Sequence, residues 1–112
     1  MNTNAITPDT LASSVIAVPP LARDAAMKVC ATENTKVIRH LEAGGVRTLL
    51  YGGNAVFYHI ALAEYAGTLA ILQENAGADS VVIPSVGPAF GTMLDQATVL
   101  HDFDFTTAMI LP

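Results

Sequence analysis

The feature that most constrains this fold is the even spacing of four short apolar runs along the chain. The runs end near Val18, Tyr51, Ile83 and Leu111, at intervals of 33, 32 and 28 residues. Each interval has room for one strand, one helix and their loops. Strands joined by such crossovers lie parallel, with right-handed connections. The spacing therefore predicts an α/β fold built on a parallel sheet.

The expected elements alternate after an irregular lead-in at residues 1–12, where Pro8 disfavours a helix. We expect strands at Val15–Val18, Val46–Tyr51, Ser80–Ile83 and Thr106–Leu111. We expect helices from Asn34 or Thr32 to Ala43, at Ala55–Asn75 and at Gly91–His101. We expect loops at Leu21–Glu33, with a helical turn near residues 25–29, and at Ser85–Phe90. The pair Gly44-Gly45 ends the first helix, and Pro84 closes the third strand.

The repeat length matches that of a (β/α)8 barrel. Such a barrel has about 250 residues, or about 31 for each unit. The 112 residues therefore count out to about four of the eight units, and residues 1–112 form one domain at most. The competing architecture is a self-sufficient, four-stranded, doubly wound sheet.

The composition indicates a chain that buries surface against something beyond itself. Apolar residues make up 52% of the sequence, charged residues make up 13%, and the mean hydropathy is +0.46. Small domains bury a smaller fraction of their surface than large ones. Half a barrel also leaves its inner strand face and two edge strands uncovered. Because Pro112 stands where a strand would pass into its loop, we expect a fragment or truncated product, or a chain that pairs with another half.

Charge and cysteine content exclude several classes of protein. The net charge is −5, with five Lys and Arg against ten Asp and Glu, which leaves too few cations for a nucleic-acid surface. Cys30 is the single cysteine, so no disulfide forms within the chain. No signal peptide or run of about 18 apolar residues is present. We expect a soluble, cytoplasmic protein without a membrane partner.

The turn after the second expected strand is the best candidate for a ligand site. Tyr51 is followed by Gly52-Gly53-Asn54-Ala55, and the glycines let a ligand approach the main chain. Asn54 is a preferred helix cap, and free N–H groups after it favour a carboxylate or a phosphate. The hydroxyl of Tyr51 could face a ligand, although a buried tyrosine commonly needs only a local partner. The glycine-rich nucleotide motifs are absent, so nucleotide binding is weakly supported.

Four segments carry a family resemblance, and they follow in one order: Val15–Pro20, Ile38–Val46, Tyr51–Ala55 and Thr107–Pro112. In these segments the chain resembles the N-terminal half of the dihydrodipicolinate synthase / N-acetylneuraminate lyase family. The resemblance implies a TIM (β/α)8 barrel, usually a homotetramer, with its active site at the carboxyl ends of the strands. It implies a lyase that makes or breaks a carbon–carbon bond next to a pyruvyl group. A lysine Schiff base serves as the electron sink, and we expect no cofactor.

The resemblance also assigns individual positions. The family's carboxylate-binding turn falls on Gly52, Gly53, Asn54 and Ala55, and Asn54 and Ala55 replace the family's two hydroxyl residues. Backbone N–H donors survive these changes. We therefore expect Gly53, Asn54 and Ala55 to hold a substrate carboxylate without the hydroxyl hydrogen bonds. The family's proton-relaying tyrosine falls at about Met109, and a methionine cannot relay a proton.

No catalytic residue is expected within this chain. The family's Schiff-base lysine would lie after Pro112, and the lysines present are Lys28, in a loop, and Lys36, at a helix start. Neither of them ends a strand, so the chain alone should not be a class I aldolase. Ser85 follows the third strand and, with Tyr51 and Met109, completes the expected site lining.

The histidines do not indicate a metal site. His40, His59 and His101 form neither a His-x-x-x-His pair nor a Glu-x-x-His pair. His59 could approach the barrel mouth, although a partly exposed helix histidine is the more common situation. We expect no metal.

Two functions remain open at this point. The first is the N-terminal half of a Schiff-base lyase that acts on a small oxo-acid, with its lysine elsewhere. The second is a non-catalytic half-barrel that oligomerises or binds a small carboxylate without turning it over.

Overall fold

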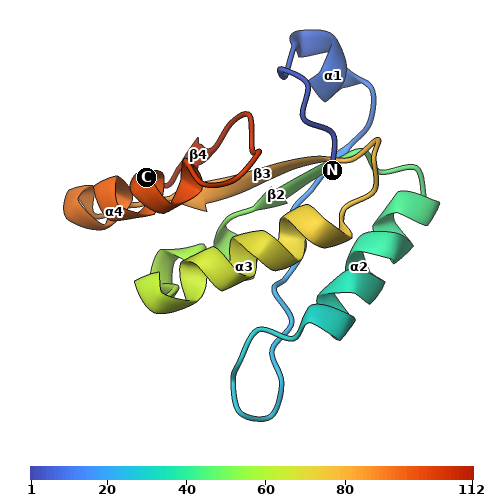
Figure 1. Ribbon diagram of the computed structural model, residues 1–112. Coiled ribbons are helices and arrows are strands. Elements are labelled where there is room, and N and C mark those ends of the chain that lie inside the picture. The colour runs from blue at the N-terminus through green and yellow to red at the C-terminus, as the bar shows by residue number, and fades with distance from the viewer.

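The computed structural model describes all 112 residues as one parallel sheet with helices packed against it (Figure 1). The strands are β1 (Ile16–Ala17), β2 (Thr48–Tyr51), β3 (Val81–Val86) and β4 (Met109–Ile110). The helices are α1 (Pro8–Ala12), α2 (Ala31–Ala43), α3 (Leu62–Asn75) and α4 (Phe90–Leu100), with 3-10 turns η1 (Gly53–Ala55) and η2 (Phe57–His59). All three strand pairs are parallel. The predicted parallel α/β sheet is confirmed.

The strands lie in the sheet in the order in which they occur in the chain. Each crossover therefore joins neighbouring strands, and right-handed crossovers place their helices on the same face. The helix α3 contacts both α2 and α4, and Figure 1 shows α2 beside α3 on one side of the sheet. A doubly wound sheet carries helices on both faces. That competing architecture is not observed.

The core lies between the sheet and its helices. Side chains alternate along a strand, so every second residue faces the helices. The buried residues of this core include Leu49 of β2, Val82 of β3, and Tyr65, Leu69 and Leu72 of α3. Burying each aliphatic side chain of this size contributes about 1.5–3 kcal/mol relative to exposure. This packing holds α3 and the sheet in a fixed relation, which in turn positions the strand ends.

The two edges of the sheet remain uncovered. Val15, beside β1, is 71% exposed, and Ile110 of β4 is 68% exposed. Phe90 and Leu94 on α4 are also exposed. These apolar side chains stand at the edge strands and on the outermost helix, where a larger sheet would continue.

One carboxylate joins the end of α2 to the segment that leads into β3. Glu42 at the end of α2 accepts hydrogen bonds from the Gly77 N–H (2.6 Å) and the Ser80 hydroxyl (2.7 Å) through Oε1, and from Arg39 (2.9 Å) through Oε2. Burial raises the pKa of Glu42, but these hydrogen bonds outweigh it and hold the pKa below its ordinary value. Arg47 Nη1 donates to the Glu42 main-chain oxygen at 3.1 Å. Both carboxylate oxygens of Glu42 are thus hydrogen-bonded, whereas the buried Thr48 hydroxyl at the start of β2 has no partner.

The lead-in and the first long helix differ from the sequence prediction at their starts. Residues 8–12 form α1, because Pro8 occupies the first helical turn, where no N–H is needed, and Thr7 and Thr10 form a capping box. The helix α2 begins at Ala31 with Cys30 at its cap position. The predicted caps Asn34 and Thr32 are therefore wrong. Helix α2 ends at the predicted glycine pair.

Asn34 instead fastens the loop before α2 to the helix. Its buried side chain accepts from the Ala22 N–H (2.9 Å) and donates to the oxygens of Ala22 (2.9 Å) and Cys30 (2.8 Å). A buried amide with three partners is well satisfied. In the loop that this asparagine fastens, Arg23 and Val29 form an isolated antiparallel bridge, so the helical turn predicted near residues 25–29 is wrong.

The long helix predicted at residues 55–75 begins only at Leu62. The two 3-10 turns precede it, and Val56 between them has the left-handed φ of 58°. A β-branched residue rarely adopts this conformation, and here it reverses the chain so that Phe57 enters the core, 1% exposed. Asn54 is consequently not a helix cap, which corrects the prediction.

The third strand continues through Pro84 to Val86, beyond its predicted end. Tyr51 is the last β2 partner, at Pro84, and β4 pairing begins at Ser85. The proline, which has no N–H to donate, therefore stands where the strand changes partner. Helix α4 starts at Phe90, one residue before its predicted start, and β4 is shorter than the predicted residues 106–111. None of the helices is long and apolar enough to cross a membrane.

Candidate functional site

The carboxyl ends of β2 and β3 and the start of β4 bring three residues together. Gly52 directly follows β2, Ser85 lies near the end of β3, and Met109 opens β4. A Cβ placed on Gly52 would lie 2.7 Å from Met109 Cε and 3.3 Å from Ser85 Oγ. Only glycine allows this approach, because the methionine and serine side chains occupy the space that a side chain would need. Two of the expected site residues thus lie against the main chain at the expected turn.

The turn after β2 presents unpaired main-chain donors. The N–H of Val56 donates to the Gly53 oxygen (3.0 Å), and the N–H of Phe57 donates to the Gly52 oxygen (3.2 Å). The N–H groups of Gly53 and Asn54 have no acceptor within the chain, and both residues are exposed. Free N–H groups in a turn suit an anionic oxygen. No helix dipole adds to them, because α3 begins at Leu62.

Asn54 and Ala55 have structural roles within the turn. The side-chain amide of Asn54 donates to the Val18 oxygen at 2.9 Å, which ties the turn to the segment after β1. Ala55 is 2% exposed and belongs to the core. Of the three predicted carboxylate-binding residues, Gly53 and Asn54 are open to a ligand through their main chain, and Ala55 is buried.

Ser85 is held by α3 while its hydroxyl stays unpaired. The Tyr65 hydroxyl donates to the Ser85 main-chain oxygen at 2.9 Å, and burial raises the pKa of Tyr65 to about 12. Ser85 is fully buried, and its Oγ has no hydrogen-bond partner. Buried hydroxyls almost always have a partner. This one lies on the side of Gly52 toward which a side chain at that position would project.

Tyr51 lies in the helix-facing core rather than at the rim. It is fully buried, and its ring centroid is 6.4 Å from that of Phe57. Burial, and then the charge of Glu42, raise the pKa of the Tyr51 hydroxyl above its ordinary value. This position does not suit a proton relay at the strand ends.

The lysines and histidines do not gather at this site. Lys36 pairs with Glu33 at 2.7 Å, and that hydrogen bond and charge raise the pKa of Lys36, which opposes a nucleophilic amine. Lys28 lies in the loop before α2. His59, expected within a helix, lies in η2 beside Tyr58, with ring centroids 6.4 Å apart. No group of three His, Cys, Asp or Glu side chains is placed to hold a metal ion.

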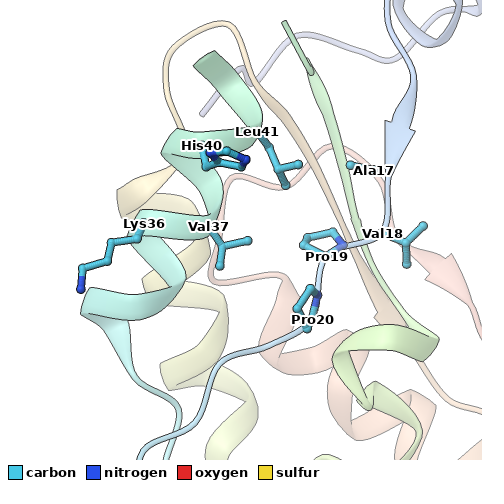
Figure 2. A pocket seen from close by; sticks show the side chains of 8 residues that line it. All are labelled: Ala17, Val18, Pro19, Pro20, Lys36, Val37, His40 and Leu41. Carbon is cyan, nitrogen blue, oxygen red and sulfur yellow. The ribbon is translucent and has the colours of Figure 1, made fainter. Parts of the chain in front are cut away.

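An apolar hollow that sequence reasoning missed lies beside β1 (Figure 2). It measures about 460 Å³ and is lined by Ala17–Pro20 and, on α2, by Lys36, Val37, His40 and Leu41. Val37 and Leu41 point toward the two prolines, whereas Lys36 points away. A second hollow of about 260 Å³ lies beside β4, with Phe103 and Phe105 in its wall. Both hollows flank the open edges of the sheet, and neither is lined by a residue of the turn after β2. The apolar pair at i and i+4 on α2 was the available signal in the sequence.

Comparisons with known proteins place the fold. The sequence matches no protein-family model and no curated protein. Among solved structures, it is similar to the dihydrodipicolinate synthase from Rhodopseudomonas palustris, with a TM-score of 0.79 and 20% sequence identity. The match covers 96% of this chain and 36% of that chain. At this identity the likeness shows the fold alone: the chain has the four-unit α/β half-barrel architecture expected from its repeat spacing, which is confirmed.

Proposed function

We propose that this chain is part of a Schiff-base, pyruvate-dependent lyase of the aldolase type, and that its turn after β2 holds the carboxylate of a small oxo-acid. The observation that carries this proposal is the pair of unpaired N–H groups at Gly53 and Asn54, at the carboxyl end of a barrel strand. Barrel enzymes place their sites at this end. Similarity to a dihydrodipicolinate synthase supports the choice of chemistry through the fold.

The residues of this chain would bind and orient the substrate rather than carry out the covalent step. Two main-chain donors can hold a carboxylate, and this fixes the neighbouring oxo carbon relative to the sheet. The amine that forms the Schiff base would come from outside residues 1–112, because Lys36 is ion-paired and Lys28 lies in a loop. Met109 at the family's tyrosine position supplies no proton, so proton transfer would also depend on another group.

The binding step can be tested with the 112-residue chain. In amide-resolved NMR, pyruvate should shift the Gly53 and Asn54 signals in a saturable way, and acetone, which lacks the carboxylate, should not. The Lys36→Ala variant is the control for nonspecific attraction of anions, and it should retain the shifts. Shifts that spread over lysine-bearing segments and disappear in this variant would contradict the proposal.

The covalent step requires a separate test. With pyruvate and borohydride, the 112-residue chain should form no adduct at Lys28 or Lys36. Any product of the same reading frame that continues past Pro112 should be labelled at a lysine about 25–30 residues farther on, one barrel repeat beyond the fourth strand. Peptide mass spectrometry locates the adduct. A longer product that binds pyruvate and yields no adduct would contradict the lyase chemistry.

A second function is favoured by the open edges of the sheet: a non-catalytic half-barrel that oligomerises. The hollows beside β1 and β4 and the exposed Val15 and Ile110 provide apolar surface at both edges. Two copies would supply eight strands, the number in a closed barrel. Sedimentation of the 112-residue chain should then show one defined oligomer, a dimer or the tetramer usual in the family. Aggregate or unfolded monomer would exclude this function.

A further inference from the structure

The Ser85 hydroxyl is the one buried unpaired group that lies beside the proposed carboxylate site. Three other buried hydroxyls lack partners, those of Thr48, Tyr51 and Thr68. Thr48 opens β2 at the opposite end, Tyr51 is in the helix-facing core, and Thr68 is on α3. Only Ser85 Oγ faces the Gly52 main chain, one residue before the free N–H groups. Ser85 therefore differs from the other three residues in its position beside the turn, and not only in the missing hydrogen bond.

Met109 covers this hydroxyl. Its Cε lies against the Gly52 backbone on the same side as Ser85 Oγ, at the position that a Gly52 side chain would occupy. Methionine is unbranched, with a flexible and polarizable thioether, so it adapts to irregular space. Leu111 Cδ2, which would lie 3.9 Å from a Gly52 Cβ, forms the outer wall. Movement of the thioether alone would open a path from the turn to Ser85.

We propose that Ser85 is a specificity-determining residue for 2-oxo acids and that Met109 is its movable cover. When a carboxylate occupies the N–H groups of Gly53 and Asn54, the oxo group on the adjacent carbon faces Gly52. The Ser85 hydroxyl donates to this second oxygen once Met109 has swung aside. This inference rests on the proposed carboxylate site. It adds the hydroxyl that contacts the oxo oxygen of the ligand and the side chain that covers this hydroxyl.

The physical basis is the asymmetry between paired and unpaired polar groups. A hydroxyl that gains a hydrogen bond on binding favours ligands that carry the acceptor, and it discriminates against those that leave it unpaired. A net hydrogen bond corresponds to about a 2- to 12-fold change in affinity. Pyruvate should therefore bind more tightly than propionate, which has the same carbon skeleton and no oxo group.

The test compares these two acids in Ser85→Ala and in the unaltered chain. From the NMR shifts at Gly53 and Asn54, the unaltered chain should prefer pyruvate about 3- to 10-fold, and Ser85→Ala should bind both acids equally. Thr48→Ala, which removes another unpaired hydroxyl, is the matched control and should keep the preference. An unchanged preference in Ser85→Ala overturns the inference and leaves the carboxylate site intact. Failure of the unaltered chain to bind either acid overturns both.

The cover is tested without any ligand. In a Cys30→Ser background, the new thiol in Ser85→Cys should react slowly with methyl methanethiosulfonate. Adding Met109→Ala should speed the reaction at least about 10-fold, while circular dichroism shows that both variants are folded. Equal rates would show that Met109 does not control access to position 85, whatever the outcome of the binding measurements.

Discussion

The parallel sheet differs between its two ends in how the polar groups around Glu42 and around Gly52 are paired. At the amino end, Glu42 accepts hydrogen bonds from Gly77, Ser80 and Arg39, so both of its carboxylate oxygens have partners. At the carboxyl end, the Ser85 hydroxyl is buried without a partner, and the N–H groups of the turn after β2 are unpaired. Both ends are built from the same strands, β2 and β3.

This difference separates stability from binding within one sheet. Paired polar groups at the amino end contribute to the free energy of folding, whereas unpaired groups at the carboxyl end keep their bonding capacity for a ligand. Barrel proteins show the same division between a stabilising bottom face and a functional top face. The comparison predicts that substitutions around Glu42 will mainly lower the free energy of unfolding, whereas substitutions around Gly52 will mainly lower the affinity for the ligand.

The largest effect on stability is expected from Glu42→Ala. It removes a carboxylate that accepts three hydrogen bonds and leaves the buried Ser80 hydroxyl without its partner. We expect a loss of about 2–3 kcal/mol in the free energy of unfolding, measured by urea denaturation. A loss below about 0.5 kcal/mol would contradict a stabilising role of Glu42 at the amino end of the sheet.

Acidification should reproduce part of this loss. The pKa of Glu42 is lower in the folded chain than its ordinary value of 4.5, so its stabilisation is complete above pH 4.5 and disappears as the pH falls through the folded-state pKa. Between pH 6 and pH 3, the unaltered chain should therefore lose more stability than Glu42→Gln does. Parallel pH profiles for the two chains would contradict this role of Glu42.

Gly52→Ala probes the carboxyl end with a smaller effect on stability. The new Cβ meets the flexible end of Met109, so we expect a cost of about 1 kcal/mol as the thioether shifts. The methyl group fills the space in front of Ser85, and pyruvate affinity should fall by about 10-fold. Gly67→Ala on α3, where a Cβ meets nothing within 4 Å, is the control, and it should keep its affinity. Equal pyruvate affinity in both variants would refute a ligand position over Gly52.

The smallest and sharpest comparison uses the two serines of one strand region. Ser80→Ala removes a hydroxyl that donates to Glu42 at 2.7 Å and should cost about 1 kcal/mol. Ser85→Ala removes a hydroxyl without a partner and should leave the free energy of unfolding unchanged or slightly increased. Urea denaturation of both variants measures the two changes in the free energy of unfolding. If Ser85→Ala costs as much as Ser80→Ala, the hydroxyl has a partner in solution.

The sequence was sufficient for the architecture because the apolar period is a property of the whole chain. Even spacing predicts parallel units regardless of where each element begins, and the glycine pair after α2 fixed the end of that helix correctly. Ser85 was expected as site lining because it follows the third strand, Met109 was expected there through the family resemblance, and both lie against Gly52. Which side chains are paired and which are not depends on packing, and the sequence does not carry that information locally.

The errors in element boundaries have specific physical causes. The helix expected from Ala55 is interrupted because Val56 adopts a left-handed conformation, which residue preferences disfavour. Pro84 was taken as a strand end, but it stands at a change of partner where its missing donor is tolerated. Asn34 was expected at a helix start, whereas its amide fastens a loop through tertiary contacts. In each case tertiary structure prevailed over local preference.

The neighbour-to-neighbour order β1-β2-β3-β4 has a consequence for how the chain assembles. During synthesis the strands leave the ribosome in the same order in which they pair in the sheet. Each new βα unit can therefore pair with the strand synthesised just before it. No unit has to wait for a distant partner or thread between earlier ones. Insertion, loss or duplication of a whole unit would disturb only two adjoining ladders, which makes this architecture tolerant of growth by increments.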